Sequence, residues 1–222
     1  MRLLACLVLT LALSAGAAAA ATPHVAVQSG DIAYTGADGV TRLLTRGGGY
    51  SDPALSPDGH TVAFIHTDAP AASTDDNAPT SLWVADGLTG AARRLAGPKP
   101  ANDPKADFAS FNTPVFSLDG GFVYVTAMAW ATSGAVHQVS LATGQQRFVI
   151  DGGVSAVIRT GPWRGYLLVQ RHMYHPAPAY GSYDPVYVVR PDGKQTFIVP
   201  GSDKTEDAAV APWLKKNGWA AW

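Results

Sequence analysis

A seven-residue segment that begins with proline and ends with glycine occurs three times in this 222-residue chain. The copies are residues 53–59 (PALSPDG), 114–120 (PVFSLDG) and 212–218 (PWLKKNG), and an apolar run follows each one. Asp-Gly or Asn-Gly between apolar runs is a strong β-hairpin signal, because a type I′ turn needs positive φ at both central residues. Proline has no N–H to donate and so suits the start of a strand. Each copy therefore predicts a hairpin of two short strands joined by a type I′ turn.

A second repeat lies between the copies of the first. It contains Gly39, Gly90, Gly144 and Gly193, which are 49 to 54 residues apart. A small polar residue precedes each glycine, and strand-like apolar runs lie on both sides. This pattern predicts a second hairpin, so each period of about 50 residues holds four antiparallel strands in chain order, which is the blade of a β-propeller. Because one blade cannot bury both of its faces alone, neighbouring blades are expected to stack on it.

The best-preserved period spans residues 53–96. It contains Ser-Pro-Asp-Gly, Val-Ala-Phe, Leu-Trp-Val-Ala-Asp and Thr-Gly-x-x-Arg-Arg-Leu in this order, and it resembles the TolB-type β-propeller repeat. That repeat also occurs in the propellers of prolyl-oligopeptidase-like and dipeptidyl-peptidase-like proteins. The next copy, with Leu118 in place of proline, is less similar. The resemblance implies an all-β propeller and a scaffold role in the cell envelope, although a shared fold does not fix function.

The two ends of the repeat region carry complementary half blades. Residues 31–35 and 40–45 indicate the two outer strands of a blade, preceded by a stray edge strand at 24–27, and residues 210–222 indicate two inner strands. We therefore expect a propeller of about four blades in residues 22–222, with one blade shared by the N- and C-termini. Such closure removes exposed sheet edges. Two alternatives stay open, namely a homodimer that forms a larger ring and an open arc. Complete blades are expected at residues 53–96, 113–150 and 154–199.

The N-terminal segment has the composition of a signal peptide. Arg2 is followed by an apolar run to Leu13 and by small residues to Ala21, which is the order of a secretory signal. We therefore expect residues 1–21 to be removed and the protein to be periplasmic or secreted, without stable membrane insertion. The alternative is an uncleaved anchor, for which the run falls short of the about 20 residues that a span needs.

The remaining composition excludes several classes of function. Cys6 lies in the expected signal peptide, so the mature chain has no disulfide and no thiol for catalysis. The net charge of −1, without long charged runs, argues against nucleic acid as a partner. Neither a Gly-x-Ser-x-Gly elbow, nor a phosphate-binding loop, nor a His-Glu-x-x-His motif is present. No cofactor is expected.

In a blade of four antiparallel strands in chain order, the long and the short connections lie on different faces of the propeller. Turns within each hairpin lie on one face, and the loops between hairpins and the links between blades lie on the other. The long segments 68–80, 97–112 and 172–184 all belong to the second set. Long loops held by a rigid scaffold commonly carry binding residues. We therefore expect the long-loop face to be the working surface.

The three long segments supply the candidate ligand-binding residues. The first reads as a weak cation or polar-ligand site or as a mobile loop, and one phenylalanine of the second is expected to fill a gap between blades. The third gathers aromatic, histidine and arginine side chains, as binding hot spots do. No metal is expected, because no helix aligns the two histidines with a third ligand. The candidates are Asp75, Asp76, Phe108, Arg171, His172, Tyr174, His175, Tyr180, Tyr183 and Asp184.

These features predict a non-enzymatic binding scaffold for another envelope protein or peptide. The alternative is a hydrolase or lyase that uses Asp and His side chains at the mouth of the channel, and a third is a purely structural piece. Carboxylates and imidazoles within hydrogen-bond reach of one another in a funnel would favour the enzyme. A flat rim with exposed Tyr174, Tyr180 and Phe108 would favour binding. Arg42, Arg93 and Arg147 share one position in the outermost strand and are expected to decorate the edge or to pair with carboxylates.

Overall fold

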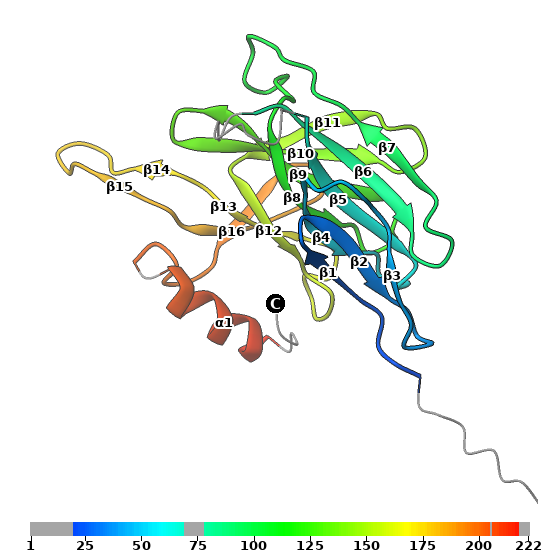
Figure 1. The fold of residues 1–222 in the computed structure, drawn as a ribbon. Helices are drawn as coiled ribbons and strands as arrows, with labels where there is room; N and C mark the ends of the chain where they lie inside the picture. The colour runs from blue at the N-terminus through cyan, green and yellow to red at the C-terminus, as the bar shows by residue number, and fades with distance from the viewer. Residues whose placement is uncertain (1–19, 69–77, 205, 218–222) are drawn as a thin grey trace, which may run out of the picture.

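The computed structural model describes residues 20–68, 78–204 and 206–217, and antiparallel sheets are its main regular structure (Figure 1). Three sheets have four strands each, which neighbour one another in chain order. Their strands are β4 (Tyr50–Leu55), β5 (Thr61–Thr67), β6 (Thr80–Asp86) and β7 (Ala92–Ala96); β8 (Phe111–Phe116), β9 (Phe122–Trp130), β10 (Ser133–Ser140) and β11 (Gln146–Asp151); and β12 (Gly153–Val157), β13 (Leu167–Gln170), β16 (Val186–Val189) and β17 (Gln195–Ile198). The three complete blades predicted from the repeats are confirmed.

The first blade has three strands, namely β1 (His24–Gln28), β2 (Asp31–Thr35) and β3 (Thr41–Leu43). The two outer strands are those predicted. The segment expected as an edge strand is β1, which lies at the edge of this sheet and pairs with β2 in a regular antiparallel register. The described residues therefore form three four-stranded blades and one three-stranded blade. The number of blades in a complete ring stays a prediction.

The first two copies of the proline-to-glycine repeat form the predicted hairpin, but the predicted turn type is wrong. Gly59 has a φ of 77°, whereas Asp58 does not have positive φ, so the turn is not type I′. A type I turn followed by one left-handed glycine fits the loop instead. Ser56 donates to the Asp58 carboxylate at 2.5 Å, and the same carboxylate accepts the His60 N–H at 3.0 Å. These bonds lower the pKa of Asp58, and Ser117 and Asp119 repeat the arrangement.

The C-terminal segment is a helix, α1 (Glu206–Lys216), and the predicted hairpin at residues 210–222 is wrong where the structure describes it. Val210, Trp213 and Leu214 have helical spacing and lie on one side of it, and the last turn is basic, which suits the helix dipole. The described part of this tail gives no strand to the first blade, so the expected sharing of a blade by the termini is also wrong. Residues 218–222 lie outside the described residues.

Helix α1 packs on the last blade instead. Val210 and Leu214 are buried against Leu168, Val186 and Val188, on the face of the blade that points away from its neighbour. The helix therefore takes the place that a further blade would occupy, as a terminal cap does in repeat proteins. None of the helices in the described part of the chain has the length and hydropathy needed to cross a membrane.

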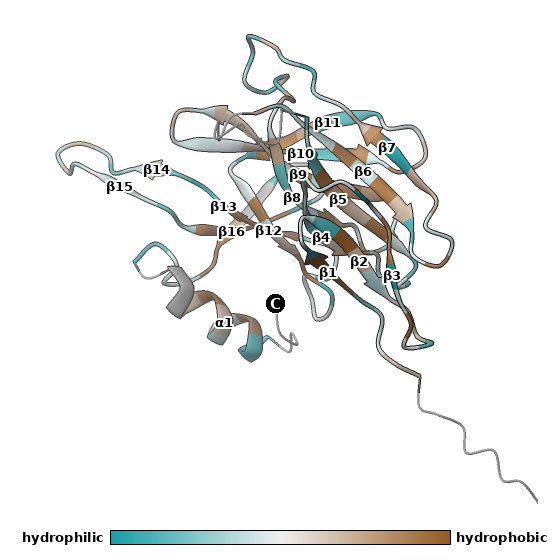
Figure 2. Ribbon diagram, in the orientation of Figure 1, coloured by the Kyte–Doolittle hydropathy of each residue, from teal (hydrophilic) through white to brown (hydrophobic). Residues whose placement is uncertain are grey.

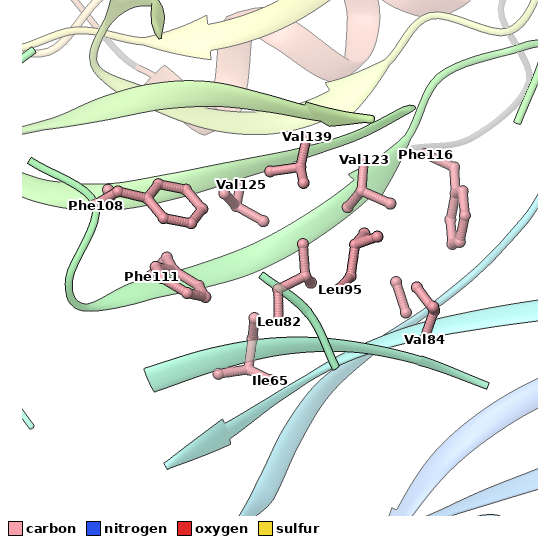
Figure 3. Packing of buried hydrophobic residues seen from close by; sticks show 12 residues of the cluster. Ile65, Leu82, Val84, Leu95, Phe108, Phe111, Phe116, Val123, Val125 and Val139 are labelled. Atoms are coloured by element: carbon pink, nitrogen blue, oxygen red, sulfur yellow. The ribbon is translucent and has the colours of Figure 1, made fainter. Parts of the chain in front are cut away.

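Each interface between blades is an apolar core. On β5, Val62 and Phe64 pack toward the first blade, whereas Ala63 and Ile65 pack toward the third in the cluster of Figure 3. Because successive side chains of a strand point to opposite faces, a strand covered on both faces needs consecutive apolar residues. Figure 2 accordingly shows hydrophobic residues along the strands and hydrophilic residues on many of the connections.

The second repeat ties neighbouring blades together. A Cβ atom on Gly144 would lie 2.5 Å from the Leu95 carbonyl oxygen of the preceding blade, and one on Gly193 would lie 2.1 Å from that of Val149. The arginine of the same repeat adds a hydrogen bond between neighbouring blades. Arg93 donates to the Leu141 carbonyl oxygen at 2.6 Å, and Arg147 donates to the Pro191 carbonyl oxygen at 2.9 Å. Arg93 and Arg147 are exposed on the outermost strands β7 and β11, as expected, but their partners are backbone carbonyl oxygens and not carboxylates, whereas Arg42 pairs with Asp38.

Candidate binding pocket

A pocket of about 550 Å³ opens where connections of the third and fourth blades meet. Its wall includes Lys105 from the link between β7 and β8, the tight turn between β9 and β10, and Asp151 at the end of β11. His172 and Tyr174 complete it from the segment that follows β13. All of these segments are loops between hairpins or links between blades. The pocket therefore lies on the long-loop face.

Arg171 supports one wall of the pocket. Its Nε and one terminal nitrogen donate to Oδ2 of Asp151 at 3.1 and 2.6 Å. The guanidinium lies over the ring of Tyr187, with 5.1 Å to the ring centroid, and the side chain is 15% exposed. A planar guanidinium held by a carboxylate and an aromatic ring has little freedom to turn. Arg171 is thus a positioning residue that fixes the Asp151 carboxylate.

His172 is held in one orientation by Asp184. Its Nδ1 lies 2.7 Å from Oδ1 of Asp184, and its ring meets that of Tyr174 edge to face at 5.0 Å. The Tyr174 hydroxyl in turn lies 3.3 Å from the hydroxyl of Thr132. Because a carboxylate accepts the Nδ1 proton, Nε2 is the acceptor nitrogen of the neutral ring, and no hydrogen bond joins it to the described residues. The pocket thus contains an oriented imidazole beside two hydroxyl groups.

The rest of the same segment forms a projecting arm. Strands β14 (Met173–Tyr174) and β15 (Ser182–Tyr183) pair as a two-stranded hairpin, which is the yellow arm at the left of Figure 1. His175 stacks on Tyr183 with ring centroids 4.6 Å apart, and Tyr180 is 94% exposed. Among the candidates from this segment, the structure therefore brings His172 and Tyr174 to the pocket, whereas His175, Tyr180 and Tyr183 belong to the arm.

Phe108 is not a surface residue, so its prediction as a ligand contact is wrong. Its side chain is fully buried and stacks on Phe111 with ring centroids 4.3 Å apart, in the core between the second and third blades. The expectation that a phenylalanine of this segment fills a gap between blades is confirmed. Asp75 and Asp76 lie outside the described residues.

Several pocket residues were missed in the sequence. Thr132 lies in the turn of two residues between β9 and β10, Trp130 and Ser133 are the strand ends beside it, and Asp151 is the last residue of β11. Loop length indicates only the long segments as candidate sites, whereas these residues lie at a short turn and at a strand end. The rule that connections between hairpins lie on the long-loop face does predict the position of the β9–β10 turn, because this turn joins two hairpins. Lys105 lies in a segment that was identified, but its charge was not singled out.

Comparisons with known proteins support the fold and identify no protein family. No protein-family model and no curated protein matches the chain. Among solved structures it is similar to dipeptidyl peptidase 4 from Porphyromonas gingivalis, with 10% identity and a TM-score of 0.53 over 80% of this chain and 31% of that chain. This likeness agrees with the stacked four-stranded meanders and with the predicted repeat. The chain has a β-propeller fold.

Two further propeller-related structures are similar at lower scores. The β-propeller domain of the Trilobed protease from Pyrococcus furiosus is 16% identical, with a TM-score of 0.47 over 75% of this chain and 48% of that one. A putative TolB from Agrobacterium tumefaciens is 16% identical, with a TM-score of 0.49 over 76% of this chain and 57% of that one. The chain thus spans less than two thirds of the length of each of these structures. Likeness at such identities shows the fold alone.

Proposed function

We propose that this β-propeller is an exported scaffold that binds a protein or peptide of the cell envelope at the pocket on its long-loop face. The observation that carries the proposal is the composition of the pocket, in which aromatic side chains, hydroxyl groups and charges of both signs come together. Tyr174 is 65% exposed and Tyr180 is 94% exposed. Exposed tyrosines give a binding surface large contact area at a low entropic cost.

The wall chemistry suits a polypeptide. Trp130 and Tyr174 offer apolar area with polar tips, as the aromatic residues of protein interfaces do. Lys105 and Asp151 have opposite charges, so they complement the amides and mixed side chains of a peptide better than a uniformly charged ligand. The arm of β14 and β15 extends this surface beyond the pocket. The predicted signal peptide supports an envelope location for the partner.

One observation favours the enzymatic alternative. The His172 imidazole, oriented by Asp184 at 2.7 Å, has the arrangement of a general base. In a hydrolase or lyase it would take a proton from water or substrate through Nε2. Replacing His172 with glutamine would then abolish turnover, whereas in a binding scaffold it would change affinity without any product forming.

The test is a selection of random displayed peptides on the purified protein, followed by affinity measurements on those selected. Tyr174→Ala is expected to weaken their binding about 10- to 30-fold, the effect of losing an exposed aromatic anchor. Leu88→Ala is the control, because Leu88 is 51% exposed and lies in the β6–β7 turn on the opposite face. The proposal fails if no peptide is enriched, or if both variants bind the selected peptides as tightly as the unchanged protein does.

A further inference from the structure

His137 on β10 is a buried polar side chain that lies between aromatic rings. It is 2% exposed, and neither ring nitrogen has a hydrogen-bond partner among the described residues. Its ring lies against Phe108 and Phe148, with centroids 5.2 and 5.9 Å away, both at steep angles. Buried polar groups are nearly always paired, so an unpaired imidazole between two phenylalanines calls for an explanation.

The rings of Phe108 and Phe148 form an aromatic cage around His137. Phe108 belongs to the same segment as Lys105, which lines the pocket. Phe108 ends the stretch 99–108, whose hydrogen bonds join Lys99 to Phe108, Ala101 to Asp107 and Asp107 to Asp103, all within the stretch itself. The buried Phe108 ring therefore anchors the stretch to the core. Lys105 lies over the Phe148 ring at 5.8 Å and lines the pocket. A movement of the stretch 99–108 would therefore change both the aromatic cage and the wall of the pocket that Lys105 forms.

We propose that His137 is an acid-sensitive latch, and that its protonation releases residues 99–108 and withdraws Lys105 from the pocket. The release itself does not depend on the proposed function. Its consequence for binding rests on that function, because Lys105 is part of the proposed peptide site.

The direction follows from the surroundings of the ring. Burial lowers the pKa of His137 from 6.5 to about 4, while the Asp107 carboxylate acts in the opposite sense. Lys105, which lies 5.8 Å from the centroid of the Phe148 ring, adds a positive charge on this side, and like charges disfavour each other. The faces supplied by Phe148 of β11 and by Val125, the partner on β9, are uncharged. No group here stabilises an imidazolium enough to offset the loss of water.

Acid therefore favours the released state. Once the stretch lifts, the ring is hydrated and its pKa returns toward about 6.5. The released state then binds the proton more tightly than the closed state does. Each unit of pH between about 6.5 and 4 favours release about tenfold, to a total of about 300-fold. Above pH 7 the ring is neutral in both states and the latch stays closed.

Fluorine NMR on the full chain tests the latch without any ligand. A trifluoromethyl label on Ala106→Cys, in a Cys6→Ser background, reports on the exposed turn beside Lys105. Between pH 7.5 and 3.5, a second signal is expected to grow as the pH falls, and circular dichroism is expected to show an intact fold. In His137→Leu, which replaces the ring with an apolar side chain of similar size, the signal is expected to stay single. His137→Phe serves as a second variant.

The outcomes separate the latch from the peptide site. The same acid-dependent signal in both His137 variants, its absence down to pH 3.5, or unfolding of the whole chain before it grows would each overturn the latch. Direct titration of the His137 ring by NMR covers the case in which the variants fold poorly, and an unshifted titration near pH 6.5 would also overturn it. If peptides have been selected, their affinity is expected to fall further between pH 7 and 4.5 for the unchanged protein than for His137→Leu.

Discussion

Gly193→Ala is expected to destabilise the protein by about 3 to 5 kcal/mol, or to prevent folding. Gly193 has a φ of 85°, which an L-residue adopts at a cost of about 1 to 2 kcal/mol. The larger effect comes from packing, since the new Cβ would lie 2.1 Å from the Val149 carbonyl oxygen. Neither atom sits on a flexible side chain, so the last blade must shift away from the third. Urea unfolding followed by circular dichroism measures the loss.

Gly90→Ala is the matched control for this prediction. Gly90 occupies the equivalent turn of the second blade with a φ of 72°, but a Cβ added there meets no atom within 4 Å. The control therefore keeps the backbone strain and removes the clash, and it is expected to cost about 1 to 2 kcal/mol. Equal losses in the two variants would mean that the repeat glycine serves the turn alone and not the contact between blades.

The blades could be predicted because their signals are local. A turn of Asp-Gly or Thr-Gly and a run such as 62–65 depend on a few neighbouring residues, and the structure has strands at those positions. The reason for the glycine was only half visible in the sequence. Its turn conformation follows from local chemistry, whereas its contact with Val149 depends on how one blade stacks on the next.

The C-terminal prediction was wrong because the proline-to-glycine pattern does not specify a hairpin by itself. Residues 212–218 match the pattern, but Val210, Trp213 and Leu214 follow the spacing of a helix face, and Lys215 and Lys216 favour a helix C-terminus. Proline inside a helix costs about 3 kcal/mol. The packing of Val210 and Leu214 on the last blade offsets part of that cost. The apolar periodicity was the better signal.

The pocket was only half predictable, for a similar reason. His172, Tyr174 and Asp184 stand out as a cluster in one long segment, and the structure joins them by direct contacts. Whether a side chain faces the pocket or the core depends on tertiary packing. Phe108 and Lys105 lie in the same segment, yet one is buried and the other lines the pocket. Sequence spacing in an irregular segment carries no period that would separate them.

Leu214→Asp is expected to cost about 4 kcal/mol and to detach α1 from the last blade. The Leu214 side chain is 5% exposed within the cluster that includes Val186 and Val188. Its removal loses about 2 to 5 kcal/mol of burial, and an aspartate left in that place would also have to give up water. Release of the helix would bare the outer face of the last blade. Urea unfolding measures the stability, and binding of a hydrophobic dye reports the bared face.

Ala211→Asp makes the same change of charge three residues earlier, on the exposed side of the same helix. It is expected to change stability by less than about 0.5 kcal/mol, so the difference between the two variants isolates the contact with the blade. A four-stranded blade with one bare apolar face is an unfinished repeat, because its core needs a neighbour. If Leu214→Asp proved as mild as Ala211→Asp, the last blade would hold its fold without a cap, and α1 would be an appendage.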